Sequence, residues 1–303
     1  MLIAAIRGEC PISGADANDR RQCTEYIIHQ LVGCKEGGLS AKIELDEFYK
    51  GTEGRLTPTQ TETNNWTAAE FERLVLECKP QIAVFDCDGT LWGGDSGSGF
   101  MNWSLEQGLV SRSTNDWIDT RYRTYLAGDV TEHEICGEMV QIYAGLRDEE
   151  LRAAAAQYFN SFIREHIFTE MSSLVEKLRG AGADLWAVSS TNRWVVAEGV
   201  RNFGIAGDHV LAADVRVEAG VITTEIVDVP TGPAKATALK RVGISKPDAV
   251  FGNSVHDLAM LEMARCAFPV NPSEALLEAA AKRGWGHFVP QGAEMHERSV
   301  AGE

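Results

Sequence analysis

The sequence predicts an α/β fold: a parallel sheet with helices on both faces, plus an inserted all-helical segment. Three observations support this prediction. Short apolar runs typical of buried strands alternate with helical patterns over much of the chain between residues 66 and 290. From Phe100 to Glu176, apolar positions recur only at helical spacing. Polar clusters directly follow three of the apolar runs, as expected where parallel strands end at one edge of a sheet.

The first predicted strand, Ile82 to Phe85, organises the rest of the chain. A helix is predicted before it, from Thr67 to Cys78, because a capping-box pattern opens a run of apolar residues at helical spacing. Asp86 and Asp88 follow the strand at alternate positions, so a regular strand would point both carboxylates the same way. Two such charges repel unless a cation offsets them or one is protonated. A plain surface turn is the other interpretation of this stretch.

A glycine-rich stretch, Trp92 to Gly99, leads from this motif into the helical segment. It predicts a loop over the two carboxylates, either a mobile lid hinge or a plain connection. About four helices are then predicted, over residues 101–110, 114–126, 131–146 and 148–167. Together they indicate a separate helical domain over residues 95–175, inserted directly after the first strand.

The remaining sequence returns to alternating strands and helices. Strands are predicted over 184–190, 248–252, 267–270 and 285–289, helices over 169–181, 193–203, 233–242, 258–264 and 272–283, and a β-hairpin over 210–229. Residues 66–94 and 176–290 are therefore assigned to one α/β core. Residues 1–65 form an N-terminal extension without an assigned function, with one predicted helix over 24–32, and residues 291–303 form a loose tail.

Composition and charge argue against several classes of partner. The formal net charge of −16 argues against a nucleic acid or an anionic membrane surface as the main partner. No apolar stretch approaches the roughly 20 residues of a membrane span. The N-terminal apolar run of about five residues is too short for a secretory signal. Seven cysteines without a C-x-x-C pair predict free thiols, which favours a reducing cytoplasm and argues against a zinc site.

Four polar clusters are expected to take part in one site. They are Asp86 with Asp88, the run 189–192, Lys235, and Asn253 with Asp257. Lys235 taken alone would be an ordinary surface lysine. As a set, the clusters match the needs of phosphoryl transfer: a carboxylate that attacks phosphorus, a lysine and a metal ion that offset negative charge, and donors for the phosphoryl oxygens. A second carboxylate can protonate the leaving oxygen and then activate water.

These motifs resemble those of the haloacid dehalogenase superfamily, most closely its phosphoserine-phosphatase-like branch. The matching motifs are D-x-D-G-T from Asp86 to Thr90, Val-Ser-Ser from Val188 to Ser190, Lys235, and Gly-Asn-Ser-Val-His-Asp from Gly252 to Asp257. The resemblance extends from about Gln81 to Val289. It implies a Rossmann-like catalytic core, and it identifies the helical segment with the cap domain that many members insert after the first strand.

The resemblance implies a role for each motif residue. Asp86 would be the nucleophile that becomes an aspartyl-phosphate, and Asp88 the general acid and base. Ser189 would bind the phosphoryl group, and Lys235 would bridge the nucleophile and the phosphate. The acid at Asp88 favours phosphatases and mutases, because the dehalogenases of this superfamily lack an acid there.

Mg²⁺ is the cofactor that the resemblance implies. Its ligands would be Asp86, the backbone carbonyl of Asp88, Asn253 and Asp257. Most family members carry an Asp where this chain has Asn253, so we expect weaker metal binding unless Asp257 compensates. His256, within the same motif, could either contact the substrate or cap the helix that follows, and capping is the favoured interpretation.

The predicted substrate-binding residues are Thr90, Asp95 and Ser190. In phosphoserine phosphatases, an acid shortly after D-x-D binds the substrate amine, and Asp95 stands near that position. Met139 stands where the family's carboxylate-binding arginine would fall, with Arg121 and Arg123 as nearby candidates. We therefore expect an amine-bearing phosphomonoester without a carboxylate rather than phosphoserine.

The sequence thus predicts a cytoplasmic, metal-dependent phosphomonoester hydrolase that acts on a small phosphorylated metabolite through Asp86. Two alternatives remain. One is a phosphotransferase or phosphomutase, which would pass the phosphoryl group to an acceptor other than water. The other is a binding protein with weak turnover, which Asn253 alone favours.

Overall fold

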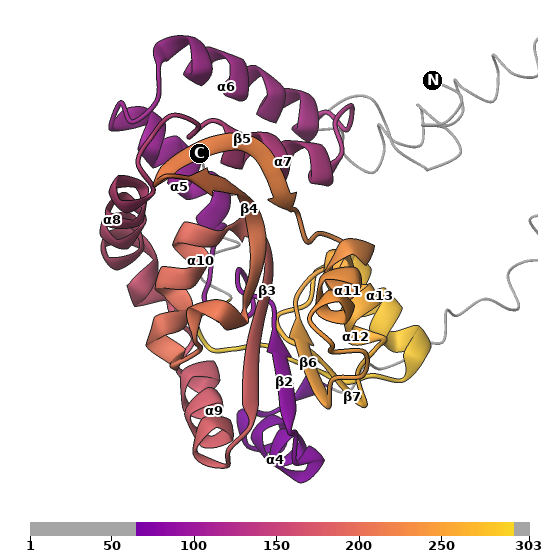
Figure 1. Ribbon diagram of the computed structural model, residues 1–303. Helices are drawn as coiled ribbons and strands as arrows, with labels where there is room; N and C mark the ends of the chain where they lie inside the picture. Colours follow the sequence, from indigo (N-terminus) through magenta and orange to yellow (C-terminus); the bar gives the residue numbers. More distant parts are fainter. Residues whose placement is uncertain (1–64, 294–303) are drawn as a thin grey trace, which may run out of the picture. The chain divides into compact units, whose positions relative to one another are not determined.

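The computed structural model describes residues 65–293 of the chain (Figure 1). The helix predicted over 24–32 lies outside the described residues, as do nearly all of the N-terminal extension and most of the tail. None of the helices in the described part is long and apolar enough to cross a membrane.

A six-stranded sheet forms the centre of the fold, in the order β5-β4-β3-β2-β6-β7. Its strands are β2 (Ile82–Phe85), β3 (Asp184–Asn192), β4 (Val210–Glu218), β5 (Val221–Asp228), β6 (Ala249–Gly252) and β7 (Cys266–Pro269). Neighbouring strands are parallel, except that β4 and β5 form the predicted antiparallel hairpin. The short strands β1 (Asn65–Trp66) and β8 (His287–Phe288) pair separately.

Helices cover both faces of this sheet, which confirms the predicted fold class. The helices are α4 (Ala68–Cys78), α9 (Thr169–Gly180), α10 (Arg193–Val200), α11 (Pro233–Arg241), α12 (Leu258–Leu261) and α13 (Glu274–Arg283). Successive residues of β2 point to opposite faces. Ala83 and Phe85 join a buried cluster with α4, α9 and α10, whereas Val84 joins another with α11, α12 and α13. Figure 1 shows these two sets of helices on opposite sides of the sheet.

The inserted segment consists of helices, as predicted. They are α5 (Ser96–Glu106), α6 (Arg112–Leu126), α7 (Glu132–Gln141) and α8 (Asp148–Tyr158), followed by a π-helical turn (Phe159–Ile163) and a 3₁₀ turn (Arg164–His166). In Figure 1, α6 and α7 lie beside the β4–β5 hairpin, beyond the end of the sheet where β2 stops. The Gln141 side chain on α7 donates to the carbonyl of Thr224 on β5, at 2.7 Å.

The glycine-rich stretch is only partly the predicted loop. Residues 96–99 form the first turn of α5, so the loop prediction was wrong there. Asp95 explains the difference, because its side chain accepts hydrogen bonds from the backbone N–H groups of Gly97 and Ser98 and caps the helix.

Two of the cysteines are bonded to each other, which corrects the prediction of free thiols. Cys78 at the end of α4 and Cys266 at the start of β7 form a disulfide, with Cα atoms 6.8 Å apart. Cys87 and Cys136 are free thiols. The free-thiol argument for a cytoplasmic location therefore loses part of its basis.

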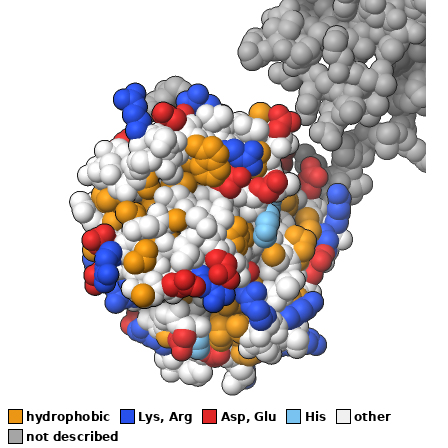
Figure 2. Space-filling view, turned by 45° about the horizontal axis from the view of Figure 1, so that its top comes forward, with side chains coloured by type: hydrophobic (Ala, Val, Ile, Leu, Met, Phe, Trp, Pro, Cys, Tyr) orange, Lys and Arg blue, Asp and Glu red, His pale blue; other side chains and the backbone are white. Residues whose placement is uncertain are grey.

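The surface carries both signs of charge close together. On the face in Figure 2, acidic and basic side chains are interspersed, and hydrophobic side chains form scattered small areas. Outside the buried Lys235 cluster, thirteen Lys or Arg ion pairs connect described residues, and twelve of them involve an Arg. This face therefore presents no single charged patch.

Candidate active site

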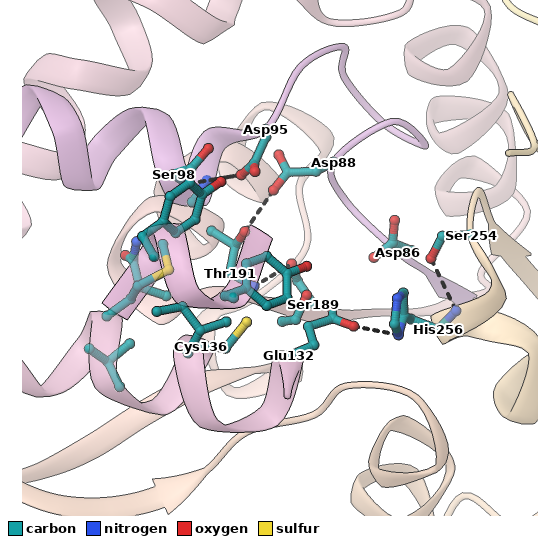
Figure 3. Close-up of a pocket in the computed structure, with 18 of the residues that line it drawn as sticks. Asp86, Asp88, Asp95, Ser98, Glu132, Cys136, Ser189, Thr191, Ser254 and His256 are labelled. Carbon is teal, nitrogen blue, oxygen red and sulfur yellow. Dashed lines mark hydrogen bonds and ion pairs between the residues drawn. The ribbon is translucent and has the colours of Figure 1, made fainter. Parts of the chain in front are cut away.

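The ends of three adjacent strands form one side of a cavity of about 360 Å³. Strand β2 leads into Asp86, β3 ends in the run 189–192, and β6 leads into Asn253. Because β2 pairs with β3 on one side and with β6 on the other, these three ends lie side by side. Helices α6 and α7 and the start of α5 line the other side of the cavity. Figure 3 shows side chains from both sides pointing into it.

Lys235 connects two carboxylates at the base of the site. Its ammonium lies 2.7 Å from Asp86 Oδ1 and 2.6 Å from Asp257 Oδ1, and all three side chains are buried. Burial alone would lower the pKa of Lys235, but Asp257 and Asp86 outweigh that effect and raise it. The ordinary surface lysine considered above is therefore excluded.

Asp86 is a carboxylate held in a buried position at the cavity wall. Its Oδ1 accepts from Lys235, and its Oδ2 accepts from the Thr90 hydroxyl at 3.1 Å. Burial, followed by repulsion from Asp257, raises the pKa of Asp86 to about 7, although Lys235 acts in the opposite direction. Thr90 is fully buried behind Asp86, so in this structure its hydroxyl contacts the predicted nucleophile.

Three donors hold the carboxylate of Asp88. The Trp92 indole Nε1 and the Ser96 backbone nitrogen lie 2.6 and 3.1 Å from Oδ1, and the Thr191 hydroxyl lies 2.7 Å from Oδ2. Burial, followed by repulsion from Asp95, raises the pKa of Asp88, while hydrogen bonds from Ser96 and Thr191 act against this rise.

The end of β3 supplies hydroxyl groups to the cavity. Ser189 is buried, and its Oγ accepts from the backbone N–H of Thr191 at 3.2 Å. Ser190 also lines the cavity. Both predicted phosphoryl- and substrate-binding serines therefore lie within the same wall as Asp86.

Asp257 uses both of its oxygens within the protein. Its Oδ1 accepts from Lys235, and its Oδ2 accepts from the backbone nitrogens of Asn253 and Ser254 at 2.8 and 3.0 Å. This carboxylate therefore fixes Lys235 and the turn after β6 at once. The side chain of Asn253 lies against Gly89, where an added Cβ would come within 1.9 Å of Asn253 Nδ2. Gly89 also has φ +74°, a conformation that favours glycine. A side chain at position 89 is therefore excluded both by the clash with Asn253 and by the backbone conformation.

The site fits a hard divalent cation by its chemistry. The site holds three buried or partly buried carboxylates, on Asp86, Asp88 and Asp257, but one buried ammonium, which contacts Asp86 and Asp257, so negative charge is in excess. Oxygen donors such as carboxylate, backbone carbonyl and the Asn253 amide suit such an ion. Among residues 65–293, no three Asp, Glu, His or Cys side chains converge to form a metal site on their own. Backbone, amide and substrate or water oxygens would complete the coordination.

The outer part of the cavity is aromatic, apolar and acidic. Its walls include Asp95, Tyr122, Tyr125, Glu132 and Met139. The two arginines considered for a substrate carboxylate are paired elsewhere and are not among the lining residues: Arg121 makes a bidentate pair with Glu138, and Arg123 pairs with Asp119.

Three contacts of the site are not predicted by the sequence. Trp92 and Thr191 bind Asp88, and His256 pairs through Nδ1 with Glu132 of α7 rather than capping a helix with its side chain. Figure 3 shows the last pair, with a dashed line joining Glu132 and His256. Thr191 belongs to the polar run at the end of β3, so its position was a usable signal. No signal in the sequence predicts the pairing of Glu132 with His256, because the two residues are far apart in sequence.

Several known proteins are similar to the chain in sequence. Residues 83–262 match the model of the haloacid dehalogenase-like hydrolase family. A probable phosphatase of Mycobacterium tuberculosis is 26% identical over 215 residues, which cover 67% of this chain and 73% of that protein. A histidinol-phosphatase of Neisseria meningitidis is 23% identical over 215 residues, or 67% of this chain and 96% of that protein.

Solved structures share the fold. A protein with unknown function from Bordetella pertussis has a TM-score of 0.60 and 25% identity, covering 68% of this chain and 97% of that chain. A probable phosphoserine phosphatase from Vibrio cholerae has a TM-score of 0.52 and 12% identity, covering 70% and 61%, and shows the fold alone. By its family match over residues 83–262, the chain belongs to the haloacid dehalogenase-like hydrolases.

Proposed function

We propose that this protein is a Mg²⁺-dependent phosphomonoester hydrolase that works through an aspartyl-phosphate on Asp86. The observation that carries the proposal is the buried triad in which Lys235 contacts Asp86 and Asp257 at the wall of the cavity. An ammonium at 2.7 Å lets a carboxylate approach a phosphoryl group that is itself negatively charged. Asp86 and Lys235 of this triad both line the cavity, where a phosphoryl group could reach them.

In the proposed reaction, Asp86 attacks phosphorus and the leaving oxygen takes a proton from Asp88. A water molecule then attacks the phosphorus of the aspartyl-phosphate and returns a proton to Asp88. Ser189 donates to a phosphoryl oxygen from the end of β3, with Ser190 beside it in the wall. Lys235 holds Asp86 in place and offsets the charge that gathers on the phosphoryl oxygens.

Mg²⁺ would be held by Asp86, the backbone carbonyl of Asp88 and Asn253. When bound, it supplies the positive charge that the carboxylate cluster lacks. The raised pKa of Asp86 supports this, because a buried carboxylate at about 7 is only partly ionised near neutral pH without a further cation. Asp257, the remaining ligand expected from the sequence, supports the site by holding Lys235 and the Asn253 turn.

We further propose that helices α5 to α8, within residues 95–175, serve as a cap over a core of residues 66–94 and 176–290. Helices α5 to α7 supply the outer cavity wall, with Asp95 at the N-cap of α5 and Met139 on α7. With acidic and aromatic side chains there and no arginine lining it, this wall suits an amine-bearing phosphomonoester without a carboxylate. One relative is named histidinol-phosphatase, and an amino alcohol phosphate of this kind has an amine and no carboxylate.

A panel of phosphomonoesters tests the proposal. We expect Mg²⁺-dependent phosphate release from p-nitrophenyl phosphate and from amino alcohol phosphates. When turnover of a phosphate-labelled substrate is stopped with a denaturing quench, the label should remain covalently bound to the protein. Asp86→Asn should abolish both, whereas the matched surface variant Asp116→Asn should keep them. Phosphate that appears only on an added acceptor would indicate a transferase. Tight binding without turnover across the whole panel would indicate a binding protein and would overturn the proposal.

The amine preference has its own test in Asp95→Asn. Asn caps helices about as well as Asp, so this change removes the charge while keeping the cap of α5. We expect kcat/KM to fall several-fold for amino alcohol phosphates, because the substrate amine loses one ion pair with an exposed carboxylate, which is worth up to about 1 kcal/mol. For glycerol phosphate, kcat/KM should stay unchanged. An equal fall for both substrates would remove the amine hypothesis and leave the phosphatase proposal intact.

A further inference from the structure

The two oxygens of Asp88 are held by chemically different donors. Trp92 Nε1 and the Ser96 backbone nitrogen, at 2.6 and 3.1 Å, both bind Oδ1. The Thr191 hydroxyl, at 2.7 Å, binds Oδ2 (Figure 3). An N–H group can only donate, so Oδ1 must remain an acceptor. A hydroxyl can donate or accept, so Thr191 keeps its hydrogen bond whether or not Oδ2 carries a proton.

The same two oxygens face different surroundings. Asp88 and Thr191 both line the cavity. Trp92 is fully buried, as is Ser96, and neither is among the lining residues. Oδ1 is therefore bound on the protein side, whereas the partner of Oδ2 lies at the surface that a substrate would meet.

The local sequence is built to allow these contacts. A Cβ at Gly97 would lie 2.7 Å from Thr191 Oγ1, so only glycine lets the first turn of α5 approach that hydroxyl. A Cβ at Gly199 would lie 2.7 Å from the Trp92 ring. Phe159 packs edge-on against the same ring, with centroids 5.3 Å apart. Trp92 and α5 are thus fixed by packing, and they fix Asp88 in turn.

Building on the function proposed above, we infer that Trp92 and Thr191 are positioning residues that dedicate Oδ2 of Asp88 to proton transfer. In the first step, the bond between phosphorus and the leaving oxygen breaks as Asp86 bonds to phosphorus, and the leaving oxygen takes its proton from Oδ2. In the second, water gives a proton to Oδ2 as its oxygen bonds to phosphorus. The bond to Asp86 then breaks, and phosphate leaves. Thr191 accepts from Oδ2 before the first step and donates to it before the second.

The test compares Thr191→Val, which keeps the shape of the side chain, with Thr191→Ser, which keeps the hydroxyl. Values of kcat/KM are measured with Mg²⁺ for p-nitrophenyl, phenyl and alkyl phosphates. The p-nitrophenolate group leaves without a proton, whereas an alkoxide needs one. We expect Thr191→Val to lower kcat/KM about tenfold or more for alkyl phosphates, as part of the general-acid effect, and at most about twofold for p-nitrophenyl phosphate. Asp88→Asn should give the same pattern more strongly, and Thr191→Ser should restore most of the loss.

The controls separate this inference from general damage and from failure of the proposed function. Thr120→Val, on the exposed face of α6, should change no rate. Trp92→Phe should also lower kcat/KM more for alkyl phosphates than for p-nitrophenyl phosphate. The melting temperature of this variant reports how much packing is lost with the indole. Equal losses for every leaving group in Thr191→Val, or no rescue by Ser, would overturn the inference even if Asp86→Asn is inactive. Absence of phosphatase activity in the unaltered protein would overturn the proposed function instead.

Discussion

At the scale of single residues, the site holds more negative charge than its one buried ammonium can offset. Asp86 and Asp257 contact Lys235, and burial, followed by repulsion from Asp257 and more weakly from Asp88, raises the pKa of Asp86. Asn253 reduces the imbalance, because its amide contributes an oxygen without a further charge. We interpret this as a compromise between stability without metal and affinity for metal.

The variant Asn253→Asp tests that interpretation. An added ligand charge strengthens binding of a divalent ion, so the Mg²⁺ concentration for half-maximal activity should fall by about tenfold. The same charge adds repulsion when no metal is present, so the melting temperature in EDTA should fall and recover with Mg²⁺. Asn115→Asp, on α6, is the matched control and should change neither quantity. If the original protein reached half-maximal activity at a lower Mg²⁺ concentration than the variant, this account would be contradicted.

Residue identity alone predicted which motif residues come together better than it predicted the contacts that hold them in place. The sequence indicated Asp86, Lys235 and Asp257, but burial decides that Lys235 is no surface residue. Trp92 was visible beside the motif, yet nothing in a linear pattern shows that an indole N–H will meet the Asp88 carboxylate. Such contacts depend on a rotamer and on where α5 begins.

At the scale of elements, one ion pair joins the inserted helices to the turn after β6. His256 Nδ1 pairs with Glu132 at the start of α7. This contact raises the pKa of His256. Burial alone would raise the pKa of Glu132, but the contact with His256 outweighs burial and lowers it. A histidine with a raised folded-state pKa stabilises the fold below its unfolded-state pKa. That stabilisation is lost as the pH rises through the folded-state value. A carboxylate with a lowered pKa acts in the opposite sense and loses its contribution in acid.

The pair should therefore stabilise the protein in mildly acidic solution and not in alkaline solution. Glu132→Gln should lower the melting temperature at about pH 6, where both partners are charged, and have little effect at about pH 9, where His256 is neutral. In a His256→Gln background, the same change should have no pH-dependent effect. Thermal unfolding of the four proteins of this cycle measures the coupling. An effect of Glu132→Gln that is equal at both pH values would show that the two groups are not paired as ions.

A second connection between elements is the disulfide from α4 to β7. Cys78 and Cys266 are 188 residues apart in sequence, so the bond closes a long loop of the unfolded chain. Reduction should lower the free energy of unfolding by about 2–5 kcal/mol. Cys78→Ser should unfold like the reduced protein and should not respond to dithiothreitol, whereas Cys136→Ser should respond as the unaltered protein does. Denaturant unfolding with and without the reductant checks this, and equal stability in both conditions would show that the bond does not contribute.

Elements were predictable where the apolar pattern was regular and the end signals were strong. Thr67 and Glu70 form the predicted capping box, and the β4–β5 turn uses Ala219 and Gly220 in left-handed conformations. The start of α5 was not predicted, because Ser96 and Gly97 are poor helix formers. Asp95 overrides that weak propensity by capping the helix.

At the scale of the whole molecule, the order of the strands brings the site together. The sequence predicted that polar clusters follow strands, but it did not show that β2 lies between β3 and β6. That order places Asp86 beside both the serine-rich end of β3 and the Asn253 turn. The pairing order depends on which faces the helices cover and on right-handed crossovers, which act over the whole sheet. The Cys78–Cys266 pair could not be predicted for the same reason.

Net charge sets the last expectation at this scale. A chain with a net charge of −16 repels an anionic phosphomonoester at long range, and the acidic wall of the cavity adds to that repulsion. Salt screens such repulsion, because the Debye length falls from about 30 Å at 0.01 M to about 10 Å at 0.1 M. At constant Mg²⁺ concentration, kcat/KM for glycerol phosphate should therefore rise over this range of ionic strength. An amino alcohol phosphate, with one compensating positive charge, should show a smaller rise. Initial rates at low substrate concentration measure both slopes, and a decrease with salt for both substrates would mean that local positive charge, rather than the charge of the whole molecule, governs substrate approach.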